Sequence, residues 1–275
     1  MKKGYIKGLK VLEVMKSGSS RPVVVEDEAG SRYLVKLRES LSNPFASISD
    51  FLSCQIGHNI GLPIAQPCLM EINGGTDIKA VDEEVRDIVR KSFGVNVAYG
   101  FQDHAVDWKY TETIDTDQQL NELFAFDLFM LNIDRTRYNA NLFSVEGNLF
   151  SFDYETSMLI IGAIQGQSYF ASEAVLKLLR ENPLYHSNID AEHIGNLQSK
   201  ISALDISWLV DMLPPQWAPD KGQMAGYLAG EIEKCTSDPG IYVEILAKLS
   251  HMTPESAEDR KKRIDGNRRQ FESKF

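Results

Sequence analysis

Three polar residues in the middle of the chain have the types and spacing that phosphoryl transfer requires. Asp134 and Asn139 are separated by four residues, and Asp153 follows at the end of a short expected hairpin. The reaction needs a carboxylate that orients and deprotonates the attacking hydroxyl, and oxygen ligands for a magnesium ion that bridges the phosphates. Asp134 matches the carboxylate, and Asn139 and Asp153 match the ligands. Asp and Asn are also frequent in plain turns, so a structural role stays open.

Two segments nearer the N-terminus favour a site for nucleotide phosphates. The first is a turn of small residues: Ser17, Gly18, Ser19 and Ser20. Backbone N–H groups of such a turn can cover phosphates, although it lacks the Walker form and an ordinary turn is the alternative. The second is Lys36, which strand alternation places on the same face as Leu34. From there its side chain can reach phosphates, and a solvated surface lysine is the alternative. The order from turn to strand lysine to Asp134 and Asp153 is that of the kinase architecture.

The composition is that of a folded protein without a whole-surface affinity for nucleic acid. The 275 residues are 43% hydrophobic and carry a net charge of −10, which excludes extensive disorder and disfavours direct nucleic-acid binding. Cys54, Cys68 and Cys235 match no zinc site or disulfide framework, so we expect reduced thiols. The N-terminus has no apolar signal core, and no apolar stretch is long enough to span a membrane. We therefore expect a cytoplasmic protein with no membrane partner.

The elements that must position these residues are expected to be strands at the front of the chain and helices behind. The pattern predicts strands at 9–15, 22–26, 32–37, 68–72 and 95–99, with helices at 44–60 and 81–93. It then predicts a helix at 116–132, a hairpin at 141–143 and 149–152, and helices at 172–180, 191–201, 208–212, 222–234 and 241–249. A boundary near residues 100–107 would leave a ligand cleft between a β-rich part and a helical part.

Three segments carry a more specific resemblance. Residues 15–37, 59–72 and 122–143 are similar to the HipA-like kinase family of bacterial proteins, relatives of the HipA toxin kinase and, more distantly, of the phosphoinositide 3- and 4-kinases. The run from Asn132 to Asn141 is the most specific part, and the similarity extends over roughly residues 5–235.

The resemblance implies an α+β, two-lobed protein-kinase-like fold that forms one kinase-like domain. Residues 1–100 would be a small antiparallel β N-lobe with helices, and residues 101–275 a larger, mainly helical C-lobe. ATP and Mg²⁺ would be the cofactors, and a Ser or Thr of a protein the acceptor. Residue by residue, the resemblance makes Lys36 the phosphate anchor, Asp134 the catalytic base, Asn139 and Asp153 the metal ligands, and residues 17–20 the ATP-covering loop. Asp50, eleven residues before Gly61-Leu62-Pro63, would pair with Lys36 where Glu is usual.

Departures from ordinary protein kinases indicate a separate branch. Asn132 replaces the His of their catalytic loop, Tyr154-Glu155 follows the metal Asp, and residues 156–168 replace a long activation loop. We expect Asp127, in an apolar helix, to be a buried anchor for the catalytic loop, because an unpaired buried carboxylate is costly. Arg135 is expected to order that loop rather than to clamp the transition state.

Two alternatives to a protein Ser/Thr kinase stay open. A small-molecule or lipid kinase, and a catalytically idle binding module with the same fold, are the alternatives. A lipid kinase should present a basic or apolar membrane-facing loop, and residues 156–168 contain no Lys or Arg. The family suggests a translation component as substrate, an antitoxin partner, and autophosphorylation of the loop at Ser17–Ser20, where added phosphate would repel the nucleotide.

Overall fold

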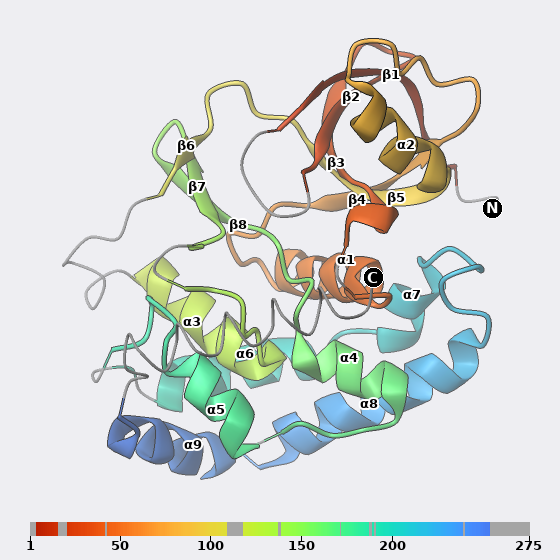
Figure 1. Cartoon of the computed structure of the whole chain (residues 1–275). Helices are drawn as coiled ribbons and strands as arrows, with labels where there is room; N and C mark the ends of the chain where they lie inside the picture. Colours follow the sequence, from red (N-terminus) through yellow and green to blue (C-terminus); the bar gives the residue numbers. More distant parts are fainter. Residues whose placement is uncertain are drawn as a thin grey trace, which may run out of the picture.

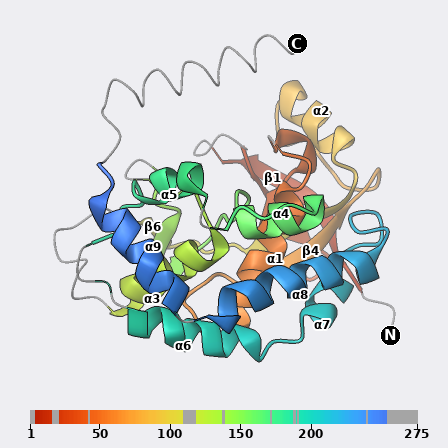
Figure 2. The same cartoon turned by 90° about the horizontal axis from the view of Figure 1, so that it is seen from below.

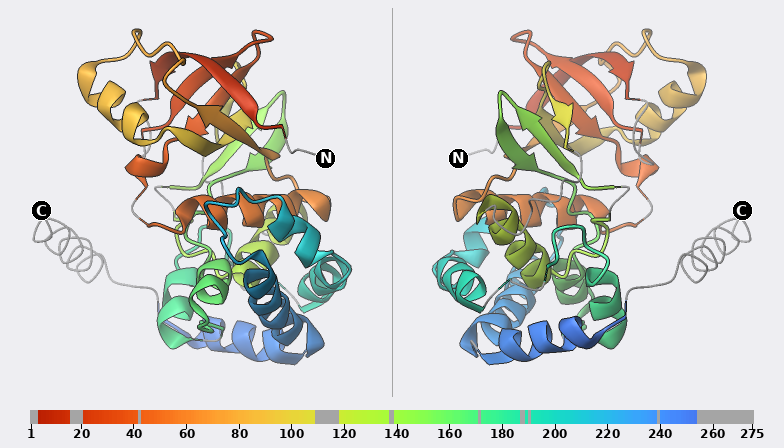
Figure 3. Two further views of the ribbon diagram at one scale, coloured as in Figure 1. Left: turned by 90° about the vertical axis from the view of Figure 1, so that its right-hand side faces the viewer. Right: turned by 90° about the vertical axis from the view of Figure 1, so that its left-hand side faces the viewer.

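The computed structural model describes residues 4–15, 21–41, 43–108, 118–136, 139–170, 172–186, 189, 191–238 and 240–253. The fold is α+β, as predicted. A β-barrel occupies one end of the molecule, a group of helices the other, and helix α1 lies between them (Figure 1). Side views show the same division, with the small sheet β6–β8 beside the junction (Figure 3).

Five strands close into a barrel in the order β1-β2-β3-β5-β4. They are β1 (Ile6–Val14), β2 (Val23–Asp27), β3 (Arg32–Lys36), β4 (Pro67–Ile72) and β5 (Gly94–Gly100). Alternate side chains fill the interior, among them Val23, Val25, Val35 and Ala98, and they form a hydrophobic core of their own with helix α2 (Glu83–Lys91). The short 3-10 helix η1 (Arg38–Ser40) follows β3 directly.

The expectation of a purely antiparallel front sheet is wrong at one junction. β1 pairs antiparallel with β2, but its first residues, Ile6 and Lys7, pair in parallel with Met70 and Glu71 of β4, and this pairing closes the barrel. β1 reaches both neighbours because its register with β2 shifts twice, and such bulges bend and twist a strand.

The second part of the chain is mainly helical and surrounds a larger hydrophobic core. Its helices are α3 (Gln118–Met130), α4 (Met158–Gln165), α5 (Glu173–Leu179), α6 (Ala191–Ser202), α7 (Ile206–Asp211), α8 (Lys221–Ser237) and α9 (Gly240–His251). Seen from below, α6, α8 and α9 close the end of the molecule away from the barrel (Figure 2). No helix in the part of the chain that the structure describes is long and apolar enough to cross a membrane.

Helix α1 (Ala46–Asn59) joins the two parts. Every residue from Ala46 to Gly57 is buried, and Phe51, Leu52 and Ile56 belong to the large core of the helical part rather than to the barrel core. A helix that is buried on all sides has neighbours all round. α1 therefore lies between the barrel strands β4 and β5 and the helices α4 and α7.

The predicted hairpin is present as β7 (Leu142–Val145) and β8 (Asn148–Ser151). A short strand, β6 (Val106–Asp107), adds to β7, so a three-stranded sheet replaces the expected two-stranded hairpin. Backbone hydrogen bonds join Ser151 to Pro63 and Ala65, and these bonds tie the end of β8 to the segment that follows α1. Residues 156–168 contain helix α4, whose residues Leu159 to Ala163 are buried.

Candidate active site

Lys36 lies at the end of β3 and points out of the barrel toward α1. Val35 and Leu37 face the barrel core, so alternation turns Lys36 to the opposite side, where its side chain is 4% exposed. Its Nζ lies 2.5 Å from Asp153 Oδ1, 3.1 Å from Asp50 Oδ2 and 3.9 Å from Glu155 Oε2. Burial disfavours the charge, but these three carboxylates outweigh it and raise the pKa of Lys36, so the ammonium stays charged.

Asp50 connects α1 to both other elements of the site. It is 1% exposed, and its Oδ1 accepts the backbone N–H of Tyr154 at 2.8 Å. Its Oδ2 accepts the hydroxyl of Tyr99 at 2.8 Å and faces Lys36. Asp50 therefore pairs with Lys36 despite its short side chain, because α1 packs against β4 and β5 of the barrel.

Asp134 and Asn139 face each other across the loop after α3. Asn139 Nδ2 donates to Asp134 Oδ2 at 2.8 Å, and Asn139 also exchanges two backbone hydrogen bonds with Thr136, at 2.9 and 3.1 Å. Burial, and next the charge of Asp153, raise the pKa of Asp134 to about 6, while Asn141 and Lys36 act in the opposite direction. Asp134 is thus close enough to Asp153 and Lys36 to interact with both electrostatically.

Asp153 follows β8 in a backbone conformation that is unusual for its type. Its φ is +64°, in the left-handed region that costs a non-glycine residue free energy and that is found at functional sites. This turn leaves its carboxylate at Lys36, while the next N–H, that of Tyr154, reaches Asp50. The strained backbone at Asp153 therefore positions two contacts, that of its own carboxylate with Lys36 and that of the Tyr154 N–H with Asp50.

A third carboxylate, that of Glu155, completes the negative surroundings of Lys36. Its Oε2 is buried and has no hydrogen-bond partner among the described residues. Burial, and then Asp153, raise the pKa of Glu155 to about 7, and Lys36 opposes them. The site therefore holds more acid than base before any ligand enters it.

The loop that carries Asp134 and Asn139 is ordered by a buried ion pair, as expected for Asp127 and Arg135. Both side chains are fully buried, and Arg135 Nε lies 2.5 Å from Asp127 Oδ2. The guanidinium also donates to the carbonyls of Ala140 and Asn141, to Ser151 Oγ and to the Tyr154 hydroxyl. With every donor turned into the protein, Arg135 orders the loop rather than facing a substrate.

Of the nine residues predicted for the site, five are described, and the structure brings them together from four separate segments: Lys36, Asp50, Asp134, Asn139 and Asp153. The predicted phosphate loop, Ser17, Gly18, Ser19 and Ser20, lies outside the described residues.

A model of the HipA-like kinase family matches residues 9–237, which include every one of these segments. The chain belongs to the HipA-like kinase family. Among solved structures, it is similar to the crystal structure of the proinflammatory kinase CtkA of Helicobacter pylori, with a TM-score of 0.50, 11% identity, and 91% of this chain and 100% of that chain covered. At this identity the similarity shows a shared fold alone. A search of curated proteins found no match.

Membership of a kinase family implies a nucleotide and a divalent cation, and the donor set fits both. Among the described residues, no three His, Cys, Asp or Glu side chains form a group that could hold a metal ion. Mg²⁺ does not need such a cage, because it is usually bound by one or two carboxylates together with substrate phosphates and water. The carboxylate of Asp153 and the amide oxygen of Asn139 are hard oxygen donors of this kind, and the positive charge would offset the acid excess.

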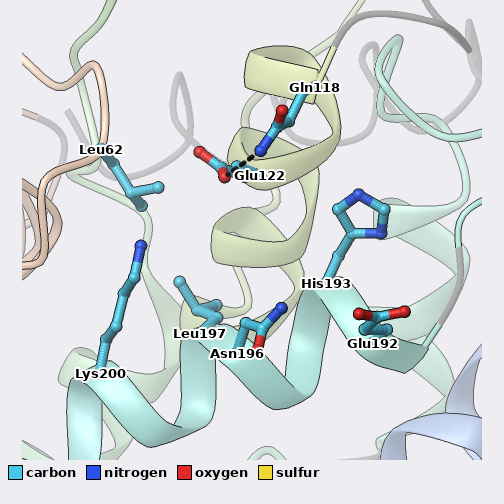
Figure 4. Close-up of a pocket in the computed structure, with 8 residues that line it drawn as sticks. All are labelled: Leu62, Gln118, Glu122, Glu192, His193, Asn196, Leu197 and Lys200. Carbon is cyan, nitrogen blue, oxygen red and sulfur yellow. Dashed lines mark hydrogen bonds between the residues drawn. The ribbon is translucent and has the colours of Figure 1, made fainter.

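A pocket of about 240 Å³ lies elsewhere, between α3 and α6 (Figure 4). Its lining residues include Glu122, His193, Asn196 and Lys200. None of the five predicted site residues that the structure describes lines it. We assign it no part in phosphoryl transfer.

Sequence reasoning missed three contributors to the site. In the sequence, Glu155 stands out only as a departure from the kinase pattern, although its position two residues after Asp153 is a usable signal. Tyr99 gave none, because a Tyr at the end of a buried strand normally packs in the core. Asn182, which donates to Asp127 Oδ2 at 2.7 Å, lies in no motif and could not be found from spacing.

Proposed function

We propose that the chain is an ATP- and Mg²⁺-dependent kinase that transfers the γ-phosphate to a Ser or Thr hydroxyl of a protein. The observation that carries the proposal is the position of Lys36, whose Nζ contacts both Asp50 of α1 and Asp153 after β8. A buried lysine held between two carboxylates from distant parts of the chain is suited to bind phosphate oxygens, since each carboxylate fixes its direction.

The remaining residues supply the other parts of the reaction. Asp134 would orient the acceptor hydroxyl and take its proton as the oxygen attacks the γ-phosphorus and the bond to ADP breaks. A carboxyl whose pKa lies near 6 is an adequate base at neutral pH, where it is mostly ionised. Asn139 and Asp153 would hold Mg²⁺, which neutralises charge on the phosphates when bound. Arg135 keeps Asp134 and Asn139 at a fixed separation through its bonds to Asp127 and to the carbonyls of Ala140 and Asn141.

The finer expectations belong to the same proposal. The barrel with α1 and α2, residues 1–100, would act as the N-lobe, and residues 101–275 as the C-lobe, with ATP between them. The loop at Ser17–Ser20 would cover the phosphates and accept autophosphorylation. The protein would act in the cytoplasm on a protein substrate, with a translation component and an antitoxin as the partners to test.

Helix α4 disfavours the lipid-kinase alternative. Leu159, Ile160 and Ile161, which a membrane-facing loop would expose, are instead buried, and Leu159 and Ile160 lie in the large core. The idle-module alternative predicts no transfer at all.

The decisive experiment incubates the purified protein with Mg²⁺ and γ-labelled ATP, in parallel with a bacterial protein extract, lipid vesicles and a pool of small hydroxyl compounds. The wild type should label protein, and Asp134→Ala should bind ATP without labelling. Asp211→Ala is the control, because Asp211 is an exposed acid at the end of α7. Label in the lipid or small-molecule pool would replace the protein acceptor, and a wild type that neither binds ATP nor transfers label would end the kinase proposal.

A further inference from the structure

A buried amide outside the catalytic motifs contacts the network that orders the catalytic loop. Asn182 lies in the turn after α5, is 4% exposed, and donates from Nδ2 to Asp127 Oδ2 at 2.7 Å. We propose that Asn182 is a positioning residue for phosphoryl transfer, which acts through Asp127 and Arg135 on the catalytic loop. The inference rests on the proposed kinase function.

The bond from Asn182 completes the set of four donors that the Asp127 carboxylate accepts. Its Oδ2 accepts from Arg135 Nε and Asn182 Nδ2, and its Oδ1 accepts from Asn132 Nδ2 at 3.1 Å and Arg135 Nη2 at 3.2 Å. An ionised carboxylate has about four acceptor sites, so each donor fixes one direction. Without Asn182, one site of a fully buried carboxylate would be unfilled where water cannot readily replace it.

Arg135 transmits the orientation of Asp127 to the residues that would do the chemistry. It follows Asp134 directly in the chain. Its Nη1 donates to the carbonyl of Ala140, the residue after Asn139, and its Nη2 donates to Ser151 Oγ at 2.7 Å and to the Tyr154 hydroxyl at 3.0 Å, on either side of Asp153. Arg135 is therefore itself the neighbour of the base, and its guanidinium contacts residues next or close to both metal ligands.

Asn182 is itself held rigidly enough to direct Asp127. Its Oδ1 accepts the N–H of Leu184 at 2.9 Å, so both ends of the amide have a partner, and this fixes which atom is oxygen. Leu184 is fully buried, and the ring of Tyr185 lies 5.5 Å from that of Phe124 on α3, between ring centroids. The turn is thus packed against the helix that carries Asp127.

A matched pair of variants separates positioning from stability. Gln198 on α6 is also 4% exposed and also donates one hydrogen bond of 2.7 Å, but its acceptor is the carbonyl of Cys235, away from the catalytic loop. Both Asn182→Ala and Gln198→Ala should lower the melting temperature, Asn182→Ala by more because it also loses the contact with the Leu184 N–H and leaves a charged acceptor unfilled. Only Asn182→Ala should lower kcat, by about 10- to 100-fold, with KM for ATP changed less than about threefold, since a small misplacement of reacting groups acts on turnover.

Asn182→Asp keeps the oxygen that binds the Leu184 N–H and sets a second carboxyl group against Asp127, so the hydrogen bond gives way to repulsion when both are ionised. It therefore tests the contact with Asp127 even if Asn182→Ala fails to fold, and it should lose kcat as well. Hydrogen exchange by mass spectrometry gives a readout that needs no activity. Peptides over residues 131–136 and 139–145 should exchange faster in both Asn182 variants and remain unchanged in Gln198→Ala.

The outcomes are separable. Faster loop exchange together with a lower kcat, in the Asn182 variants alone, supports positioning. Equal exchange in the Asn182 and Gln198 variants, or faster exchange with an unchanged kcat, overturns it. If the wild type transfers no phosphate, the proposed function fails, and the exchange measurement alone decides whether Asn182 orders the loop.

Discussion

At the scale of single residues, the site is defined by an imbalance of charge. Lys36 is the cation that faces Asp50, Asp153 and Glu155 together, and all four side chains are largely buried. Such a cluster is stable only while the lysine is charged and present, because an unpaired buried carboxylate is expensive. A bound cation and the phosphates it accompanies would therefore change the existing contacts between Lys36 and the three carboxylates.

Removal of the cation should therefore affect both stability and binding. We expect Lys36→Met to lower the free energy of unfolding by about 3–5 kcal/mol, since Asp50 stays buried without its counter-charge. ATP affinity should fall at least about tenfold, because the phosphates lose their cation. Denaturant unfolding and titration with a fluorescent ATP analogue measure the two effects. Lys200→Met, an exposed lysine of α6, is the control and should change neither.

Glu155 makes the stability of the unliganded protein depend on pH. Its pKa is raised from 4.5 to about 7, so the folded state holds a proton between these values that the unfolded state has released. Stability should accordingly fall as pH rises from about 4.5 to about 7. Glu155→Gln should match the wild type near pH 4.5 and exceed its unfolding free energy by about 1–3 kcal/mol above pH 7. Unfolding curves across this range test it, with the exposed Glu28→Gln expected to follow the wild type.

The sequence predicted the residues whose chemistry has a recognisable spacing and missed those whose role arises from packing. Asp134, Asn139 and Asp153 stand in a spaced motif, and Lys36 stands on a strand whose alternation determines its direction. Asn182 and Tyr99 act because a folded neighbour brings an acid to them, and no local pattern records that neighbour.

At the scale of elements, the distance between α1 and the strands determines which acid can serve Lys36. Asp50 reaches Lys36, Tyr99 and the Tyr154 N–H together although its side chain is one methylene shorter than the Glu that is usual in the family. α1 therefore lies close enough to the barrel for an Asp side chain to make all three contacts. The sequence predicted the helix but not this approach, because α1 is buried on nearly all sides and has no single apolar face.

This approach predicts that restoring the usual family residue is harmful. Asp50→Glu adds a methylene at a position that is 1% exposed, so we expect a loss of about 1–3 kcal/mol in unfolding free energy from overpacking. ATP affinity should fall as well, since Lys36 would be displaced. Asp50→Asn, which keeps the size and removes the charge, is the comparison. A stabilised Asp50→Glu protein with tighter ATP binding would contradict the close approach.

At the scale of the whole molecule, two hydrophobic cores are joined through α1. The barrel and α2 share one core, and the helical part with α1 shares the other. Most strands and helices were predicted near their observed bounds, because strand alternation and helical spacing are local. The closure of the barrel through the parallel β1–β4 pair, the strand β6 and the buried helix α4 were not predicted, because each depends on a partner distant in sequence.

Gly57 is the point where the junction between the two parts can be tested. A Cβ added there would lie 2.2 Å from Ile64 Cδ1 and 3.1 Å from the Phe126 ring of α3, and Ile64 is itself only 2% exposed, so its side chain cannot turn into solvent. Gly57→Ala must then displace Ile64 or shift α1 against its neighbours, at a cost of about 1–3 kcal/mol in unfolding free energy. Gly226 is the matched control, because it is exposed on α8 with nothing within 4 Å of an added Cβ. Gly226→Ala should raise the unfolding free energy by about 0.5–1 kcal/mol from helix propensity.

The same substitutions should differ in ATP binding. Because α1 also carries Asp50, Gly57→Ala should weaken ATP binding while Gly226→Ala leaves it unchanged. If both substitutions stabilise the protein, or if ATP affinity is insensitive to Gly57→Ala, α1 does not couple the packing of the helical part to the lysine of the barrel.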